Sequence, residues 1–229
     1  MCGSLTFWGY VWGILSILVA ASTSVGYYFA DWLSGDPKFN GVSPTNYTDL
    51  SFFNQTIDVK FTFSTFRRCN HWVDVGCSNG ARYCVEEECG RYSEFSGTNG
   101  IPSDAWRAGA ILGGIACGLL ILVALTAVFA FFIKGIFNKY VAGICGFLQA
   151  LAGLSVAATV LIYPVGWDAD TVRKEACGFD ADKYKLGDCS LGWAFWLSAA
   201  SAILALAVAC MSPAAKKDSE SLYSRGYTI

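Results

Sequence analysis

The chain has 229 residues, of which 54% are hydrophobic and only 15% are charged, and its formal net charge is −2. A soluble domain usually carries about 25% charged residues, so the surplus of apolar surface indicates a membrane protein. The sequence contains no basic patch suited to a polyanion, which argues against nucleic-acid binding.

Four apolar runs divide the sequence, and none of them contains Asp, Glu, Lys, Arg or His. The runs cover residues 5–30, 108–133, 141–162 and 191–211. Because about 20 apolar residues are enough to cross the hydrocarbon core of a bilayer, we predict four transmembrane helices. We expect one domain over residues 1–211, with loops over 31–105 and 165–190, followed by a disordered cytoplasmic tail over 212–229.

The first run could instead be a secretory signal peptide. Residues 1–4 lack the basic start of such peptides, and the apolar run is longer than a signal core. We therefore interpret the run as a membrane helix that stays in the protein.

Small residues recur at four-residue spacing in all four runs. The sets are Gly9/Gly13, Ser16/Ala20/Ser24, Gly109/Gly113, Gly114/Gly118, Ala142/Gly146/Ala150, Gly153/Ala157, Ala194/Ser198/Ala202 and Ser201/Ala205/Ala209. Helices in lipid associate by close packing of small residues, so we predict a bundle that packs on itself in preference to a dimer seam. We expect Gln149 to hydrogen-bond a neighbouring helix. The lack of intramembrane charge argues against proton- or ion-coupled transport.

The two long loops carry features of an oxidising compartment. The first holds Cys69, Cys77, Cys84 and Cys89, and the second holds Cys177 and Cys189. Asn46 and Asn54 each begin an N-glycosylation sequon in the first loop. Even cysteine counts and sequons both place the loops outside the cell, so we predict a multi-pass plasma-membrane protein with both termini in the cytoplasm. The positive-inside rule conflicts with this orientation, because four Lys and Arg residues lie in the second loop.

The first loop shows the pattern of a β-hairpin. Residues Ile57–Phe66 alternate, with Val59, Phe61 and Phe63 on one face and polar residues on the other. Asn79-Gly80 is a strong turn signal. A hairpin around this turn places Cys69 opposite Cys89 and Cys77 close to Cys84.

We therefore predict the disulfides Cys69–Cys89 and Cys77–Cys84, with Cys177–Cys189 closing the second loop. The pairings 69–77 with 84–89, and 69–84 with 77–89, remain open but fit a hairpin less well. The cysteine spacings match no zinc motif, and His71 is the only histidine in the chain. We expect no metal and no cofactor.

Catalytic motifs are missing from the sequence. The chain has no helical HExxH, no phosphate-binding glycine loop and no nucleophile elbow. We therefore expect that the protein is not an enzyme.

Three features belong to the predicted cytoplasmic side. Cys2 and Cys210 lie next to membrane segments and are candidates for palmitoylation, whereas we expect Cys145 to be a buried free thiol. The chain ends with Tyr227-Thr228-Ile229, an apolar-x-apolar pattern that is a candidate ligand for a PDZ groove.

Several segments resemble one family of membrane proteins. They are Ala30-Asp31-Trp32-Leu33, Cys89-Gly90-Arg91-Tyr92, Tyr163–Trp167 and Tyr184–Phe195. With these segments, the helix count and the loop order, the chain resembles the lipoma HMGIC fusion partner-like tetraspan proteins, apart from the middle of the first loop and the tail. A more distant likeness is to claudins, whose Gly-Leu-Trp-x-x-Cys motif has a degraded counterpart ending at Cys69.

The resemblance implies a claudin-like fold. We therefore expect an all-α membrane bundle of four transmembrane helices that carries a small extracellular antiparallel β-sheet. It also implies a non-enzymatic auxiliary subunit, since members of the family look like partners of inhibitory pentameric receptors or of the hair-cell mechanotransduction complex. The expected function is thus assembly of a larger membrane protein, such as a channel or receptor. The alternative is a claudin-like junction protein that self-associates.

Overall fold

A computed structural model describes residues 7–36, 57–75, 83–94, 100–133 and 139–225. The chain divides into two compact units, where sequence analysis expects one domain. The helix unit comprises residues 1–27, 111–158 and 197–229, and the sheet unit comprises residues 28–110 and 159–196. The two cysteine-containing loops therefore belong to the same unit.

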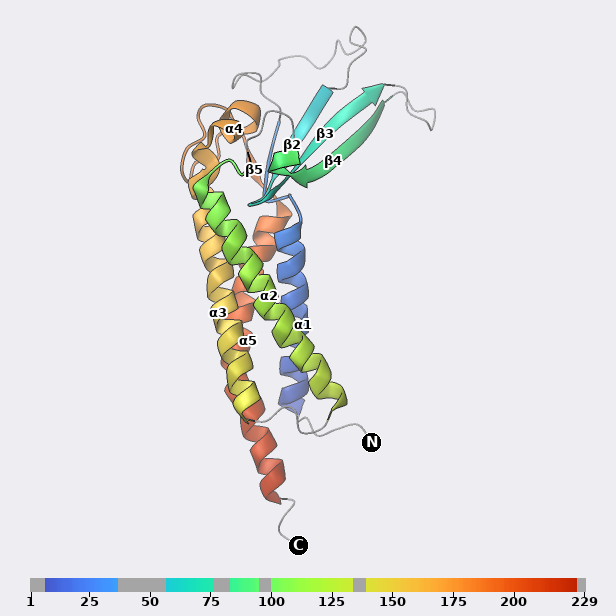
Figure 1. Ribbon diagram of the computed structural model, residues 1–229, viewed down its shortest axis with the longest axis vertical. Helices are drawn as coiled ribbons and strands as arrows, with labels where there is room; N and C mark the ends of the chain where they lie inside the picture. Colours follow the sequence, from blue (N-terminus) through green and yellow to red (C-terminus); the bar gives the residue numbers. More distant parts are fainter. Residues whose placement is uncertain (1–6, 37–56, 76–82, 95–99, 134–138, 226–229) are drawn as a thin grey trace. The chain divides into compact units, whose positions relative to one another are not determined.

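The four predicted membrane helices are confirmed. They are α1 (Phe7–Tyr28), α2 (Asp104–Phe132), α3 (Lys139–Ile162) and α5 (Trp193–Arg225). Each contains a segment that is long and apolar enough to cross a membrane. Within the helix unit the four helices lie side by side (Figure 1).

Helix α2 begins earlier than its apolar run does. The Ser103 hydroxyl accepts a hydrogen bond from the backbone N–H of Trp106 at 3.1 Å, which is the geometry of an N-cap. Asp104 then occupies the first turn, where a negative charge is favourable. The polar first turn is invisible to a search for apolar residues, so the predicted start at residue 108 is late.

Helix α5 continues past residue 211, where the sequence analysis ends the span. It runs through Pro213 to Arg225, across most of the segment that we expect to be disordered. The residues after Pro213 include Ala, Lys, Glu and Leu, all of which are good helix formers. The span that suits a membrane nevertheless ends at Pro213, close to the predicted position.

Small residues bring the helices of the helix unit together, as predicted. A methyl group added to Gly146 would meet the Ser212 hydroxyl, and one added to Gly153 would lie 3.1 Å from the Ala205 methyl carbon. The Gly114/Gly118 pair is an exception, because Gly118 is exposed and has open space where a Cβ would be. Most of the small residues therefore serve the packing of the chain on itself.

Gln149 behaves as the sequence predicts. Its side chain is fully buried, and its Nε2 donates to the Ser16 Oγ of α1 at 3.3 Å. The Ser16 hydroxyl in turn donates to the carbonyl of Trp12 at 2.8 Å. A second pair of hydroxyls, Ser201 and Ser22, links α5 to α1 at 2.9 Å. These polar contacts join helices that are otherwise apolar.

The sheet unit contains the predicted antiparallel sheet. Its strands are β1 (Leu33–Gly35), β2 (Ile57–Phe63), β3 (Arg67–Val75), β4 (Tyr83–Arg91) and β5 (Ser190–Leu191). They lie in the order β4-β3-β2-β1-β5, and every pair is antiparallel. Figure 1 shows the long pair β3 and β4 beside β2.

The predicted hairpin is present as β3 and β4. Its register places Cys69 directly opposite Cys89 and Asp74 opposite Cys84. The predicted alternation of β2 holds only in part. Phe61 and Phe63 are buried as expected, but Thr62, which we assign to the polar face, is 1% exposed. Both faces of β2 are therefore covered at this point of the strand, whereas strict alternation predicts one open face.

Strands β1 and β5 are absent from our sequence-based prediction. They are short, and they join the start of the first loop to the end of the second through the pairs Leu33–Leu191 and Ser34–Ser190. Gly192 follows β5, and a Cβ there would collide with the backbone carbonyl of Asp31. A glycine is thus required where the two loops meet.

Candidate functional site

The sheet unit is built around a cluster of buried aromatic side chains. Trp106 from α2 stacks on Tyr163 with ring centres 4.9 Å apart and planes at 9°. Trp32 meets the same tyrosine edge to face at 5.0 Å. Phe63 and Tyr92 pack against Trp106 at 6.1 Å and 6.0 Å. Offset-stacked and edge-to-face pairs are the favoured arrangements, and each adds about 0.5–1.5 kcal/mol to the burial energy.

Three polar groups of this aromatic cluster donate hydrogen bonds to backbone carbonyls of other segments. The indole N–H of Trp106 donates to the carbonyl of Tyr163 at 2.9 Å. The Tyr163 hydroxyl donates to the carbonyl of Phe63 at 3.0 Å, and the Tyr92 hydroxyl donates to that of Ser64 at 2.7 Å. These bonds tie the ends of the membrane helices and the strands into one core.

Burial has a chemical consequence for Tyr92. Loss of hydration raises the pKa of its phenol well above the usual value, and the positive charge of Arg68 opposes this only in part. The hydroxyl therefore remains a hydrogen-bond donor across the physiological pH range.

An ion pair between a buried arginine and a half-buried glutamate joins the two loops. Arg68 on β3 is 5% exposed at its side chain, and its guanidinium lies 2.7 Å from the carboxylate of Glu175 in the second loop. Its Nε donates to Asn70 at 2.7 Å, and its charge lies 4.9 Å from the ring centre of Phe61. Removing one member of such a pair leaves a desolvated charge unpaired. No sequence pattern predicts this contact, because Arg68 and Glu175 are far apart in the chain.

The second loop is compact. It consists of a 3-10 helix (Tyr163–Asp168), the single turn α4 (Asp170–Val172) and a π-helical turn (Arg173–Cys177). The predicted disulfide Cys177–Cys189 closes it. A Cβ on Gly35 would meet the Cys189 sulfur, so β1 lies directly against this disulfide.

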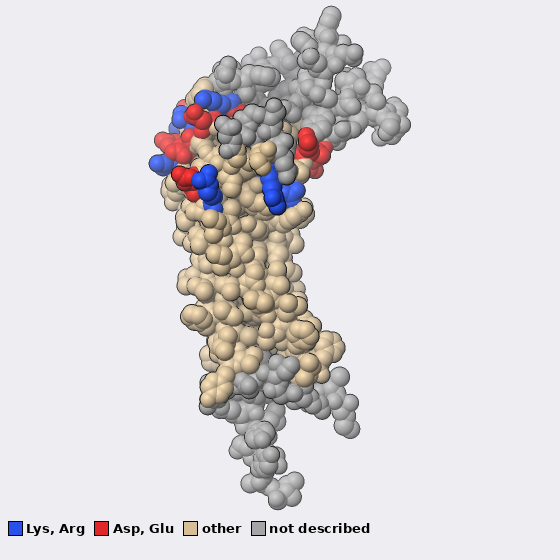
Figure 2. All heavy atoms as spheres, in the orientation of Figure 1, with Lys and Arg blue, Asp and Glu red and all other residues tan. Residues whose placement is uncertain are grey.

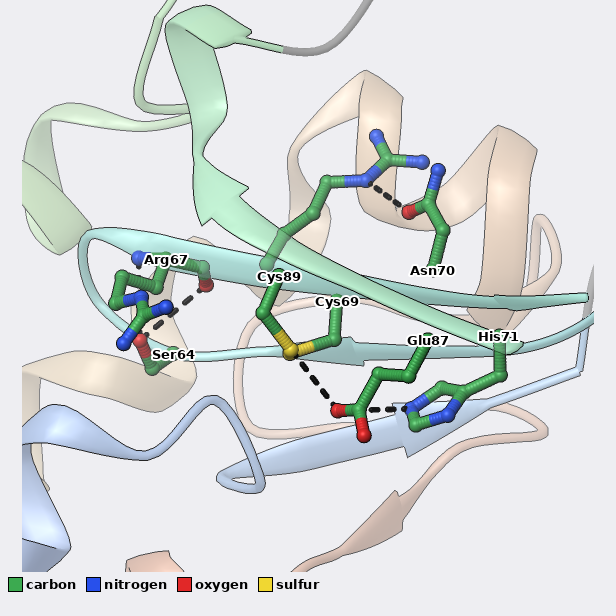
Figure 3. The surroundings of a disulfide bond; sticks show 8 residues. Ser64, Arg67, Cys69, Asn70, His71, Glu87 and Cys89 are labelled. Atoms are coloured by element: carbon green, nitrogen blue, oxygen red, sulfur yellow. Dashed lines mark hydrogen bonds and ion pairs between the residues drawn. A yellow bond between two sulfur atoms is a disulfide. The ribbon is translucent and has the colours of Figure 1, made fainter. Parts of the chain in front are cut away.

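The predicted disulfide Cys69–Cys89 joins β3 to β4. It excludes both alternative pairings, since each of them assigns Cys69 to another cysteine. Figure 3 shows Glu87 beside it, with Oε1 2.9 Å from the Cys89 sulfur and 3.9 Å from the His71 Nε2. The sulfur carries no proton, so its contact with Glu87 is not a hydrogen bond.

Metal binding finds no support at this point. In the part of the chain that the structure describes, the group of potential metal ligands is Cys69, Glu87 and Cys89. Because the disulfide uses both sulfurs, no thiolate is left to bind an ion. The side chain of His71 is 18% exposed.

Charged side chains are distributed unevenly on the surface. On the face shown in Figure 2, Lys, Arg, Asp and Glu gather over the sheet unit, and the described surface of the helix unit shows none. The second loop also exposes two aromatic residues, Phe179 at 52% and Tyr184 at 65%. The sheet unit therefore exposes aromatic side chains among charged ones, and aromatic residues are enriched at protein interfaces.

Several of the predicted sites lie outside the described residues: Asn46, Asn54, Cys77, Cys2 and the terminal Tyr227-Thr228-Ile229. The sequons, the second hairpin disulfide and the PDZ ligand therefore stay predictions. Cys145 is a buried free thiol, as expected, and Cys210 is an exposed one. Exposure of Cys210 is compatible with acylation but does not test it.

Comparison with known proteins identifies the family. The family described as "Lipoma HMGIC fusion partner-like protein" matches residues 8–215, which include all four membrane segments. The chain belongs to this family. It is 32% identical over 209 residues to human LHFPL tetraspan subfamily member 2 protein, with 90% of this chain and 86% of the relative covered.

Two further relatives extend the comparison. Zebrafish (Danio rerio) LHFPL tetraspan subfamily member 2a protein is 33% identical over 210 residues, covering 90% of this chain and 85% of the relative. Mouse LHFPL tetraspan subfamily member 4 protein is 38% identical over 124 residues, covering 51% of this chain and 47% of the relative. The tetraspan name of these relatives agrees with the four membrane helices of this chain.

Proposed function

We propose that this lipoma HMGIC fusion partner-like protein is a non-enzymatic auxiliary subunit. It binds a larger membrane protein, such as an ion channel or receptor, and supports its assembly or delivery to the plasma membrane. The observation that carries the proposal is the uncharged membrane core: residues 5–30, 108–133, 141–162 and 191–211 contain no ionisable Asp, Glu, Lys, Arg or His. Coupled transport normally uses such residues, so a binding role suits the bundle better.

The sheet unit supports a role in contact. One disulfide closes each loop, and the Arg68–Glu175 pair and the aromatic core hold the two loops against each other. A braced surface loses little entropy when a partner binds. The exposed Phe179 is a suitable anchor for a partner, because aromatic side chains contribute strongly at the centres of interfaces.

The orientation belongs to the same proposal. We place the sheet unit outside the cell and both termini in the cytoplasm, on the basis of the disulfides and of the sequons at Asn46 and Asn54. Glycosidase treatment should increase the gel mobility of the protein, and a double Asn46→Gln and Asn54→Gln variant should show no such shift. Labelling of a carboxyl-terminal tag on intact cells would contradict the orientation.

A direct test follows the client. The tagged full chain is purified in mild detergent from native tissue, the co-purifying channel or receptor is identified, and its surface level is measured after the chain is depleted. The proposal expects this level to fall, and the wild-type chain but not Phe179→Ala to restore it. Asp180→Ala is the matched control, since Asp180 is also exposed and adjacent in sequence.

The competing function is a junction protein of the claudin type. That function expects cells expressing this chain alone to adhere and to form strands at their contacts. If freeze-fracture shows such strands and native pull-downs yield only the chain itself, the auxiliary-subunit proposal is wrong.

A further inference from the structure

A half-buried arginine and three exposed aromatic rings form a cluster outside the core of the sheet unit. The guanidinium carbon of Arg67 lies 4.3 Å from the ring centre of Tyr28. The Tyr28 ring meets Phe29 at 6.0 Å, and Phe29 meets Trp193 at 5.2 Å. We call these four residues the interfacial cluster. Arg67 is the first residue of β3, Tyr28 and Phe29 lie at and just after the end of α1, and Trp193 begins α5.

The chain positions of the rings place the cluster at the edge of a membrane. Tyr28 is the last residue of one candidate span, and Trp193 is the first residue of another. All three rings are open to the surroundings, with exposed fractions of 58% for Tyr28, 44% for Phe29 and 48% for Trp193. Exposed aromatic residues at span ends prefer the depth of the lipid headgroups.

The backbone of Arg67 is fixed by a tight turn. The Ser64 N–H donates to the Arg67 carbonyl at 2.8 Å, and the Arg67 N–H donates to the Ser64 hydroxyl at 3.2 Å. Figure 3 shows Ser64 and Arg67 side by side at this turn. Because the turn defines where the side chain begins, less conformational entropy is lost when its guanidinium binds a ligand.

Arg67 also differs from other arginines of the sheet unit. Arg68 is paired with Glu175, and Arg107 lies 3.1 Å from Asp104. Across the described segments, no carboxylate lies within ion-pair distance of Arg67. The face of the Tyr28 ring attracts the cation but leaves its charge in place and its N–H edge available. A planar guanidinium of this kind matches the oxygens of a phosphate.

We propose that the interfacial cluster binds the phosphate of a membrane phospholipid. Arg67 donates hydrogen bonds to the phosphate oxygens, while Phe29 and Trp193 contact the glycerol and the upper acyl chains. Charge complementarity selects this occupant, because phosphate is the abundant anion at headgroup depth. The site goes beyond the proposed function and does not depend on the identity of the client.

The test compares two lipids with the same acyl chains. The full-length chain in mild detergent is titrated with dioleoylphosphatidylglycerol or with dioleoylglycerol, which lacks the phosphate, and bound lipid is measured by native mass spectrometry. The wild-type chain should retain the phospholipid in preference to the diacylglycerol. Arg67→Gln should weaken phospholipid retention by about tenfold, as expected for loss of a charge-assisted hydrogen bond.

Two further variants complete the test. Tyr28→Leu removes the ring beneath the guanidinium and should weaken phospholipid retention less than Arg67→Gln does, and it provides a second reading if Arg67→Gln does not fold. Arg107→Gln is the matched control and should leave retention unchanged. Equal retention of both lipids by the wild-type chain, unchanged retention by folded Arg67→Gln, or an equal loss in Arg107→Gln would each overturn the proposal. Loss of a bound client by Arg67→Gln without loss of lipid would assign the cluster to a protein partner instead.

Discussion

The helix unit and the sheet unit are each stabilised internally by a different kind of interaction. The helix unit packs through glycine, alanine and serine residues, with a few hydrogen bonds between helices. The sheet unit packs through large aromatic rings, two disulfides and the Arg68–Glu175 ion pair. In lipid, association gains little from apolar burial, so helices need close fit. The sheet unit relies on the burial of large rings, which is favourable only where the unfolded chain would expose them to water.

This contrast predicts that single substitutions weaken the sheet unit far more than the helix unit. The largest effect is expected from Trp106→Ala. Trp106 is completely buried, stacks on Tyr163 and donates to its carbonyl. Loss of such a side chain destabilises a protein by about 3–5 kcal/mol. The measurement is the midpoint of thermal unfolding in detergent, followed by size-exclusion chromatography after heating.

Trp196→Ala is the matched control for Trp106→Ala, since Trp196 also belongs to the sheet unit but is 60% exposed. It should change the midpoint little. Equal shifts in the two variants would show that burial of the aromatic core does not determine stability.

The second largest effect is expected from opening the second loop. Cys177→Ser with Cys189→Ser removes the bridge between residues 12 positions apart, against which β1 also packs. A disulfide over a loop of this size contributes about 2–4 kcal/mol. Surface biotinylation should detect less protein at the plasma membrane, because the endoplasmic reticulum retains misfolded chains. Cys145→Ser replaces a free thiol and serves as the control.

A smaller effect is expected from the Arg68–Glu175 pair, and it depends on which member is lost. Arg68→Met leaves the Glu175 side chain, which is 34% exposed and can still reach water. Glu175→Gln leaves the nearly buried Arg68 charge without its carboxylate, so we expect this variant to be the less stable, by about 1–3 kcal/mol relative to wild type. A double-mutant cycle measures the coupling. A coupling energy of zero would show that the pair does not hold the loops together.

The sequence reveals much of the fold because the periodic signals are local. Charge-free runs identify the four spans, and the turn signal of the Asn79-Gly80 sequence predicts a register in which Cys69 faces Cys89, as observed. Features that depend on distant residues escape this reasoning. The strands β1 and β5 are too short to show a period, and they form because the two loops meet. The polar first turn of α2 is set by the cap at Ser103, which an apolar pattern does not detect.

The candidate interaction surface is less predictable than the disulfides. Cys177 and Cys189 are paired correctly because they are alone in their loop. Arg67 and Arg68 are adjacent and chemically identical, yet one is paired with Glu175 and the other lies over Tyr28. Only the direction of each side chain from β3 separates these roles. Successive side chains of a strand point to opposite faces of the sheet, and the sequence does not show which other segment covers each face.

The smallest effect is expected in the helix unit, at the bond between Gln149 and Ser16. Gln149 donates one hydrogen bond, but its buried Oε1 has no hydrogen-bond partner in the described structure. Gln149→Leu removes the bond, worth about 0.6 kcal/mol within a membrane, and also removes the unsatisfied acceptor, so its net effect should be close to zero. Ser16→Ala leaves both polar ends of Gln149 unpaired and should cost about 1 kcal/mol. The midpoint of thermal unfolding in detergent should therefore be lower for Ser16→Ala than for Gln149→Leu, although the glutamine is the larger side chain.

Ser155→Ala is the control, because that hydroxyl donates to the carbonyl of Leu151 within its own helix. The opposite ranking would mean that the glutamine side chain itself, by filling space or through its Oε1, stabilises the bundle more than its bond to Ser16 indicates.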